Sequence, residues 1–326
     1  MPCPARHGVR ATALPDRYPE DSGGCVYAGR LDNDRFHEES QMTLPTFLGI
    51  GVPRAGTTWL HTLLTSHPDV YMPTRRKEIR FFDQYYERGL SWYEEFFCPP
   101  EQAHRYQAIG EISTQYYDGE ECPERIFTAL PEIKMIIILR HPVNRAYSQY
   151  GFTAQRRNYR GSFEDFLAAR PSALEKGFYS RYLKRYLRYF DRTQILALLF
   201  EEVFIDVLNT KRTIANFLDI DVDEFPAFVT GDKVNASSVP KFRSLYGFVV
   251  KTGRRLRRRN LERVVDFVMR TRIQRILAKG NSLPPLNEEL KQQLSQIYQD
   301  EFDELEQCLQ IDLSCWRKQE DVRRMS

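Results

Sequence analysis

Long hydrophobic runs, paired cysteine motifs and a strong charge of one sign are all missing from this sequence of 326 residues. No stretch approaches the ~20 apolar residues that a membrane-spanning helix needs. The six cysteines are scattered without a C-x-x-C pair, which favours neither a metal site nor a dense disulfide framework. A formal net charge of +3 does not by itself indicate nucleic-acid binding. We therefore expect a globular, cytoplasmic protein with no metal, no nucleic-acid partner and no integral membrane segment.

The first 41 residues lack the continuous apolar segment of a secretory signal and show no sustained periodicity. They are rich in Gly, Pro, Asp and Arg, so we predict a disordered extension over 1–41. Met42 directly precedes the first strand-like run and is a candidate start of the native protein. We place one domain at 42–318 and a flexible tail at 319–326.

Strand-like and helix-like segments alternate through the predicted domain. Buried strands are predicted at 46–52, 134–140 and 194–203 from short apolar runs. Helices are predicted at 57–68, 144–157, 183–190 and 210–220, with a further amphipathic helix at 283–309. The alternation predicts an α/β fold: a single domain with a central parallel sheet flanked by helices.

The segment GIGVPRAGTTWL (49–60) has the frame of a phosphate-binding loop, G-x-x-x-x-G-K-[ST], between a predicted strand and a predicted helix. Thr57 replaces the lysine, and Arg54 lies inside the loop. Backbone amides at a helix N-terminus form an anion cradle. The missing lysine normally reaches the β- and γ-phosphates of a nucleoside triphosphate, so the loop favours a ligand without a γ-phosphate.

A second set of polar residues follows the strand predicted at 134–140. In a triphosphatase an aspartate at such a strand end would hold Mg²⁺, whereas Arg140 occupies the place here. An arginine at the carboxyl edge of a parallel sheet is suited to clamp an anion. Ser148 lies about two helical turns further on, so the pair could hold a second phosphate.

Two phosphate sites without a magnesium ligand suggest a nucleotide phosphorylated at both its 5′ and 3′ ends. PRAGTTWL resembles the 5′-phosphosulfate loop of the sulfotransferases, and RHPVNRAYS resembles their 3′-phosphate motif, R-x7-S. RRKEIRFFD (75–83) resembles the K-E-x-H-F-F-D segment of the heparan-sulfate-type enzymes, and GEISTQYY (110–117) resembles their G-E-x-S/T segment. The similarity runs from about Phe47 to Trp316.

This resemblance implies transfer of a sulfonate group from 3′-phosphoadenosine 5′-phosphosulfate (PAPS) to an acceptor hydroxyl or amine, with release of 3′-phosphoadenosine 5′-phosphate (PAP). Arg54, at a position that is commonly lysine, would stabilise charge on the oxygen that bridges sulfonate and phosphate. The cofactor-binding residues implied are Arg54, Ala55, Gly56, Thr57, Thr58, Trp59, Arg140, Ser148, Asn235 and Lys241.

The resemblance also implies that Glu78 is the general base that removes the acceptor proton. Taken without the motif, Glu78 would read as a surface carboxylate paired with the neighbouring basic residues. Arg80 stands where the heparan-type motif has histidine, which leaves the acceptor open. Residues expected to line the acceptor cleft are Lys77, Arg80, Phe82 and Tyr116.

Three functional interpretations remain: a PAPS-dependent sulfotransferase, a small-molecule kinase or triphosphatase with a degenerate loop, and a non-catalytic protein that retains the pocket. The first, in a bacterial setting, could act on a sugar or a small metabolite. The segment 251–275 carries ten Lys and Arg against Glu262 and Asp266, which fits either a solvated helix face or a surface for an acidic carrier protein.

Overall fold

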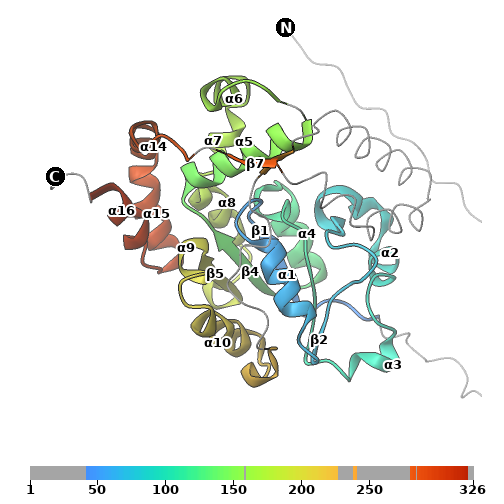
Figure 1. The fold of residues 1–326 in the computed structure, drawn as a ribbon. Helices are drawn as coiled ribbons and strands as arrows, with labels where there is room; N and C mark the ends of the chain where they lie inside the picture. Colours follow the sequence, from blue (N-terminus) through green and yellow to red (C-terminus); the bar gives the residue numbers. More distant parts are fainter. Residues whose placement is uncertain (1–41, 158, 227–237, 241–279, 284, 322–326) are drawn as a thin grey trace, which may run out of the picture. The chain divides into compact units, whose positions relative to one another are not determined.

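The central sheet of the protein contains five parallel strands in the order β2–β3–β1–β4–β5 (Figure 1). The computed structural model describes residues 42–157, 159–226, 238–240, 280–283 and 285–321. The strands are β1 Phe47–Gly51, β2 Val70–Tyr71, β3 Ala108–Ile112, β4 Lys134–Leu139 and β5 Ile195–Leu199. A separate antiparallel pair joins β6 Ser238–Pro240 to β7 Gly280–Ser282.

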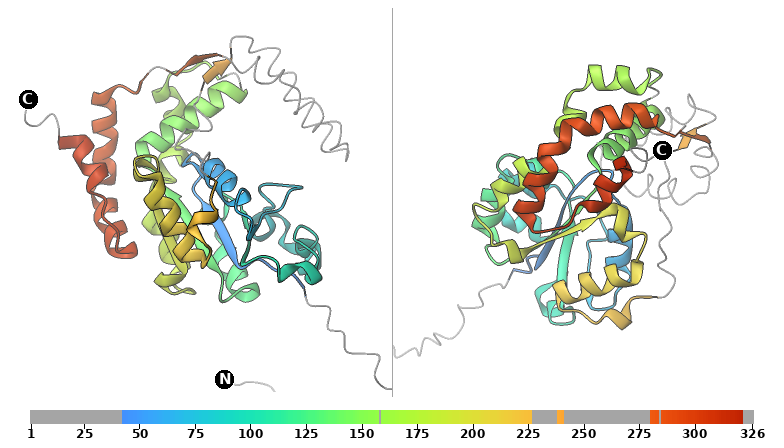
Figure 2. Two further views of the ribbon diagram at one scale, coloured as in Figure 1. Left: turned by 60° about the horizontal axis from the view of Figure 1, so that its bottom comes forward. Right: turned by 90° about the vertical axis from the view of Figure 1, so that its left-hand side faces the viewer.

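Helices cover both faces of this sheet (Figures 1 and 2). The α-helices are α1 Thr57–Thr65, α2 Leu90–Glu94, α3 Pro100–Ala103, α4 Cys122–Ala129, α5 Pro142–Arg157, α6 Phe163–Ala169, α7 Ser172–Glu175, α8 Tyr179–Tyr186, α9 Phe200–Val203, α10 Val207–Leu218, α14 Glu288–Ser295, α15 Gln299–Leu309 and α16 Ser314–Asp321. Short helical turns are η1 Phe81–Tyr85, η2 Tyr86–Arg88, η3 Tyr116–Asp118, η4 Arg192–Gln194, η5 Val222–Glu224 and η6 Gln296–Tyr298. No helix of the described residues is both long and apolar enough to cross a membrane.

The central strand β1 is enclosed on all sides. Every residue of β1 and β3 is buried, as expected of a parallel sheet whose two faces are covered. Leu48 of β1 is level with Glu111 of β3 on one side and with Met135 of β4 on the other. Because parallel strands end at the same edge, this register brings the loops after β1, β3 and β4 together.

The predicted α/β fold with a parallel sheet is confirmed, but two predicted elements have different bounds. The strand predicted at 194–203 ends at Leu199, and Phe200–Val203 forms helix α9. The predicted 283–309 helix is divided into α14 and α15 by the turn η6. Strands β2 and β3 carried no strand prediction, because β2 is only two residues long and β3 contains Gly110 and Glu111.

Candidate active site

The loop after β1 turns sharply into α1 at Gly56. Gly56 has φ 89°, a left-handed conformation that residues with a Cβ rarely adopt. A Cβ added at this position would lie 3.2 Å from the Phe200 ring. Among the described residues, no side chain caps the start of α1. The first helical amides are therefore not capped by a side chain of the described residues, as at an anion-binding helix N-terminus.

Three of the predicted cofactor residues meet at this loop, although they come from two distant segments. Arg54 Nε donates to Ser148 Oγ of α5 over 3.2 Å, and Arg140 Nη1 donates to the Arg54 carbonyl over 2.9 Å. Arg140 follows β4 directly, and its own carbonyl accepts from the Tyr179 hydroxyl at 2.7 Å. The first and second motifs are thus joined by hydrogen bonds.

Aromatic rings hold the guanidinium groups in place. The Arg140 guanidinium lies 4.4 Å from the centre of the Phe200 ring. Phe152 of α5 contacts two cations, with Arg54 at 4.7 Å and Arg156 at 4.8 Å. Such contacts orient a guanidinium and leave its N–H edge available for an anion.

Positive charge is concentrated at this point of the molecule. Burial, followed by repulsion from Arg140 and Arg156, lowers the pKa of Arg54 to about 10. Burial also lowers the pKa of Arg140, with Arg145 adding to the shift and Glu201 opposing it. Arg140 Nε is buried and has no hydrogen-bond partner among the described residues. A bound anion would relieve the repulsion and supply the missing acceptor.

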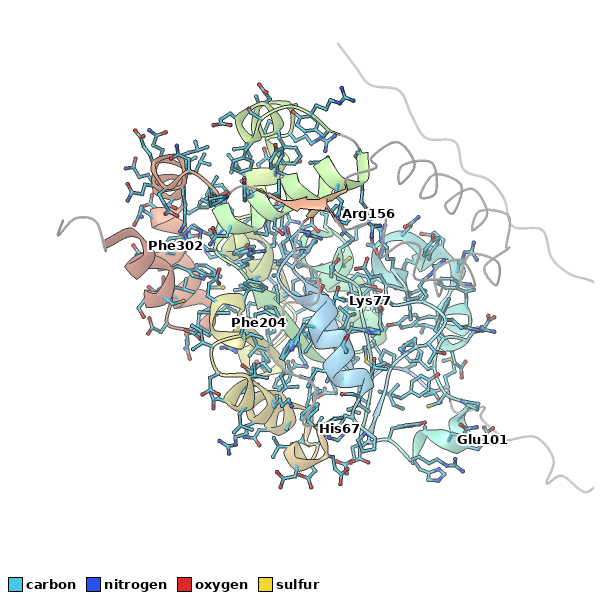
Figure 3. The ribbon with its side chains drawn as sticks, in the orientation of Figure 1. His67, Lys77, Glu101, Arg156, Phe204 and Phe302 are labelled. Carbon is cyan, nitrogen blue, oxygen red and sulfur yellow. The ribbon has the colours of Figure 1, made fainter. Side chains whose placement is uncertain are left out.

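Lys77 reaches the same loop from the segment after β2. Its ammonium donates to Thr58 Oγ1 at 3.2 Å, and burial lowers its pKa while Glu78 opposes that shift. In Figure 3, Lys77 and Phe204 lie on either side of α1. Phe204 packs edge-to-face on the buried Trp59 with ring centres 5.5 Å apart. Lys77, predicted to line the acceptor cleft, therefore contacts the loop that carries Arg54 and Thr58.

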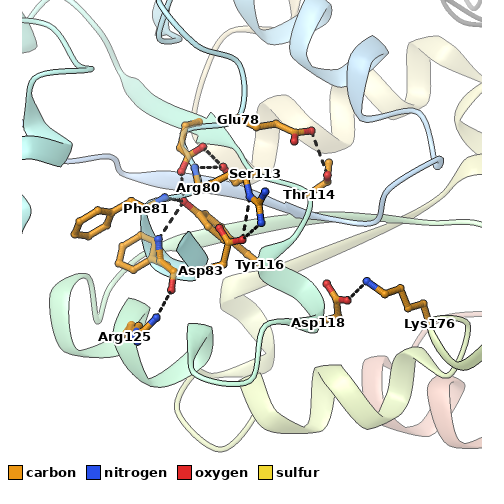
Figure 4. Close-up of polar contacts among 12 residues, drawn as sticks. Glu78, Arg80, Phe81, Asp83, Ser113, Thr114, Tyr116, Asp118, Arg125 and Lys176 are labelled. Carbon is orange, nitrogen blue, oxygen red and sulfur yellow. Dashed lines mark hydrogen bonds and ion pairs between the residues drawn. The ribbon is translucent and has the colours of Figure 1, made fainter. Parts of the chain in front are cut away.

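Glu78 lies next to Lys77 and is half-buried. Its Oε1 accepts from Thr114 Oγ1 at 3.1 Å, and Thr114 follows β3 (Figure 4). The carboxylate thus stands between the loop after β1 and the segment after β3. This position could accept a proton from an acceptor group that approaches the cofactor loop.

The other residues predicted to line the acceptor cleft divide into two kinds. Arg80 keeps 38% of its side chain exposed and pairs with Asp83 through Nε at 2.9 Å. Phe82 and Tyr116 are completely buried. The Tyr116 hydroxyl accepts from the backbone amide of Phe81 at 2.9 Å. Phe82 and Tyr116 therefore support the loop from beneath in this structure, and of the three only Arg80 is in a position to face an acceptor.

Some predicted residues lie outside the described residues: Asn235, Lys241, the basic segment 251–275 and the extension 1–41. Within the described residues, α16 continues to Asp321, past the predicted domain end at 318. Sequence reasoning did not single out Phe152, Arg156, Thr114 or Glu111. Thr114 and Glu111 belong to the GEISTQYY motif, so that motif was the available signal. Phe152 and Arg156 of α5 gave no such signal, because one aromatic and one basic residue on a helix are common in any sequence.

Comparisons with known proteins agree on one family. A family model for the sulfotransferase domain matches residues 44–249. Human bifunctional heparan sulfate N-deacetylase/N-sulfotransferase 3 is 28% identical over 299 residues, covering 85% of this chain and 31% of that protein. The membrane-associated sulfotransferase kil1 of Dictyostelium discoideum is 36% identical over 118 residues, covering 36% of this chain and 25% of that protein. The chain thus spans about a third or less of the length of these relatives.

A crystal structure of a sulfotransferase from Alicyclobacillus acidocaldarius has the same fold. It superposes with a TM-score of 0.61 at 23% identity, covering 84% of this chain and 99% of that one. These matches come from vertebrate, Dictyostelium and bacterial proteins, so the predicted bacterial origin and cytoplasmic location stay predictions.

Proposed function

Because the chain belongs to the sulfotransferase domain family, we propose that it transfers a sulfonate group from PAPS to a hydroxyl or amine of an acceptor. The observation that carries this proposal is the meeting of Arg54, Arg140 and Ser148 at the start of α1. A kinase or triphosphatase is less well supported, since an arginine stands where such enzymes need a metal-binding carboxylate.

In this proposal the two ends of the nucleotide bind to the two motifs. The amides of Gly56, Thr57 and Thr58 and the Thr58 hydroxyl would hold the 5′-phosphate. Arg140 and Ser148 would hold the 3′-phosphate, and the buried, unpartnered Nε of Arg140 fits that task. Trp59 matches a position that packs on adenine in related enzymes. Here its ring is buried against Phe204, so any adenine contact would use an edge of that ring pair.

Glu78 is the proposed general base, and Arg54 with Lys77 stabilises the leaving oxygen. The acceptor oxygen or nitrogen forms a bond to sulfur while the bond from sulfur to the 5′-phosphate oxygen breaks. Glu78 takes the acceptor proton, and the electron pair of the broken bond stays on PAP. Two nearby cations stabilise that developing charge because both are partly buried, where electrostatic interactions are stronger than in water.

The acceptor is proposed to be a sugar or a small metabolite. The human relative is named for N-sulfation of heparan sulfate, which favours a glycan amine or hydroxyl. The segment 76–92, which includes Glu78, carries aromatic rings covered by arginine, with Arg76 5.4 Å from Tyr85 and Arg88 5.0 Å from Trp92. Arginines on this segment suit a polar, anionic acceptor chain. An acidic carrier protein finds no support in the comparisons.

A thermal-unfolding titration with PAP, set against ATP–Mg²⁺, tests the cofactor assignment. A ligand that binds only the folded state raises its stability, by about 2.7 kcal/mol at a hundredfold excess over Kd. We expect stabilisation by PAP in the wild type, most of it lost in Arg140→Ala and partly restored in Arg140→Lys. Stabilisation by ATP–Mg²⁺ alone would contradict the proposal and favour the kinase. Transfer from [³⁵S]PAPS to N-desulfated heparan sulfate then tests the acceptor.

A further inference from the structure

A single carboxylate lies buried beneath the loop that carries Glu78. Glu111 of β3 is completely buried, and its two oxygens accept four hydrogen bonds. Oε1 accepts from the hydroxyls of Tyr93 at 3.2 Å and Tyr116 at 2.6 Å. Oε2 accepts from Ser113 Oγ at 2.7 Å and from the Ile79 amide at 3.4 Å. These four donors favour the ionised carboxylate, and they oppose the burial that raises the pKa of Glu111.

Two of these hydroxyls also accept hydrogen bonds from backbone amides of the loop, as Figure 4 shows. Ser113 Oγ accepts from the Arg80 amide at 2.9 Å. The Tyr116 hydroxyl accepts from the amides of Phe81 at 2.9 Å and Phe82 at 3.4 Å. Together with the direct bond to the Ile79 amide, four consecutive amides are therefore tied to one carboxylate, either directly or through one hydroxyl.

The direction of these bonds depends on the charge of the carboxylate. Each hydroxyl has one proton, which it donates to Glu111, so its lone pairs are free to accept from the loop amides. A protonated carboxyl would need an acceptor of its own, and one hydroxyl would have to turn. The titratable groups that face Glu111 are Tyr93 beside it on α2 and Tyr116 on η3, and burial raises the pKa of both. They stay neutral while burial raises the pKa of Glu111 to about 7.

The loop needs such support because its backbone is strained. Arg80 has φ 63°, a left-handed conformation that is costly for a residue with a side chain and persists where the surroundings fix it. Arg125 of α4 adds a bond to the Phe82 carbonyl at 3.0 Å. Thr114, three residues after Glu111, holds the Glu78 carboxylate itself. The end of β3 and the residues after it, 111–116, thus contact every residue from 78 to 82.

We propose that Glu111 is a positioning residue for the general base: through Ser113 and Tyr116 it fixes the backbone of 79–82 and hence the place of Glu78. This inference rests on the proposed function, because it assumes that Glu78 removes the acceptor proton. It goes beyond that function because it assigns the positioning of the Glu78 carboxylate to a second, buried carboxylate that touches neither substrate.

A matched pair of variants tests this role. Tyr93→Phe and Tyr116→Phe each remove one hydroxyl from the same oxygen of Glu111, and each keeps its ring. Only Tyr116→Phe also removes the acceptor for two loop amides. We expect Tyr116→Phe to lower kcat about 10- to 100-fold, as for a misplaced catalytic group, with the KM for PAPS and the affinity for PAP within twofold. Tyr93→Phe should keep kcat within about threefold.

Hydrogen exchange of the peptides that contain residues 79–82 provides a readout independent of activity. We expect faster exchange there in Tyr116→Phe than in Tyr93→Phe, with unchanged exchange in β1 and β4. Equal exchange and equal kcat in the two variants would overturn the proposal, as would a loss of PAP affinity that matches the loss of kcat. A wild type that transfers no sulfonate would instead contradict the proposed function, while the exchange comparison still decides whether Glu111 orders the loop.

Glu111→Gln adds a pH readout, provided it folds. The amide resembles the protonated carboxyl because it also brings N–H groups toward the same donors. We expect kcat of the wild type to rise with pH through about 7, and kcat of the variant to be low and to lack that rise. An unchanged acidic limb in a folded Glu111→Gln protein would count against the positioning role.

Discussion

The two halves of the candidate active site are stabilised in opposite ways. The cofactor half places Arg140 and Arg156 near Arg54, in the loop before α1, and both arginines repel the Arg54 guanidinium. The base half is organised around Glu111, whose charge is matched by four donors from the protein itself. An anion would improve the first half, whereas the second is complete without a ligand. The cofactor half should therefore respond strongly to nucleotide and the base half hardly at all.

Glu78→Gln gives the largest expected effect and separates the chemistry from binding. The amide cannot take a proton, so kcat should fall by about 10²- to 10⁴-fold. The contact from Thr114 is kept, because the amide oxygen still accepts. Affinity for PAP, measured by calorimetry, should stay unchanged, since Glu78 belongs to the base half.

Two outcomes would overturn this division. A wild-type rate in Glu78→Gln would remove the general-base role. PAP binding by a wild-type protein that forms no product with any acceptor would favour the non-catalytic binding protein.

A smaller effect is expected from alanine substitutions at two glycines with positive φ, because only one of these glycines lies in the cofactor half. Gly56→Ala and Gly89→Ala each force a Cβ into a left-handed or extended positive-φ conformation, so each should lose roughly 1–3 kcal/mol of stability. Only at Gly56 does the new Cβ approach Phe200, at 3.2 Å, and a Cβ at Gly89 meets nothing within 4 Å. Thermal unfolding with and without PAP should show a reduced PAP shift in Gly56→Ala alone. Equal PAP shifts in the two variants would mean that the loop does not bind the nucleotide.

The last comparison concerns the pH dependence of stability in the base half, which needs no ligand. Burial raises the pKa of Glu111 from its ordinary value of 4.5 to about 7. The folded state keeps a proton that the unfolded chain has released, so this contribution is full below about 4.5 and is lost as pH rises through about 7. The free energy of unfolding should fall by up to ~1.4 kcal/mol per pH unit across this window. Denaturant unfolding of Glu111→Gln should lack that slope, and an identical slope in both proteins would contradict the assignment.

Much of the cofactor half could be predicted because its residues lie in two short, contiguous motifs. The strand, loop and helix around Arg54 follow from local apolar runs and glycine spacing, and β1 and α1 agree with that prediction. The link from Arg140 and Ser148 to Arg54 was not predictable from spacing, since it depends on β1 and β4 being neighbours in the sheet. The strands β2 and β3 were missed, because one is too short and the other carries a charge in its middle.

By itself, the sequence determined the α/β class, the strand–loop–helix around Arg54 and the sulfotransferase motifs that contain Arg54 and Arg140. These are local properties, fixed by the period of apolar residues and by the φ angles that glycine permits. Only the tertiary structure decided that Glu111, which belongs to the GEISTQYY motif, lies beneath the loop that carries Glu78. It also decided that the side chains of Phe82 and Tyr116 are buried under that loop. The physical reason is that burial and hydrogen-bond partners depend on the order of strands in the sheet. Residues far apart in the chain become neighbours only when that order is set.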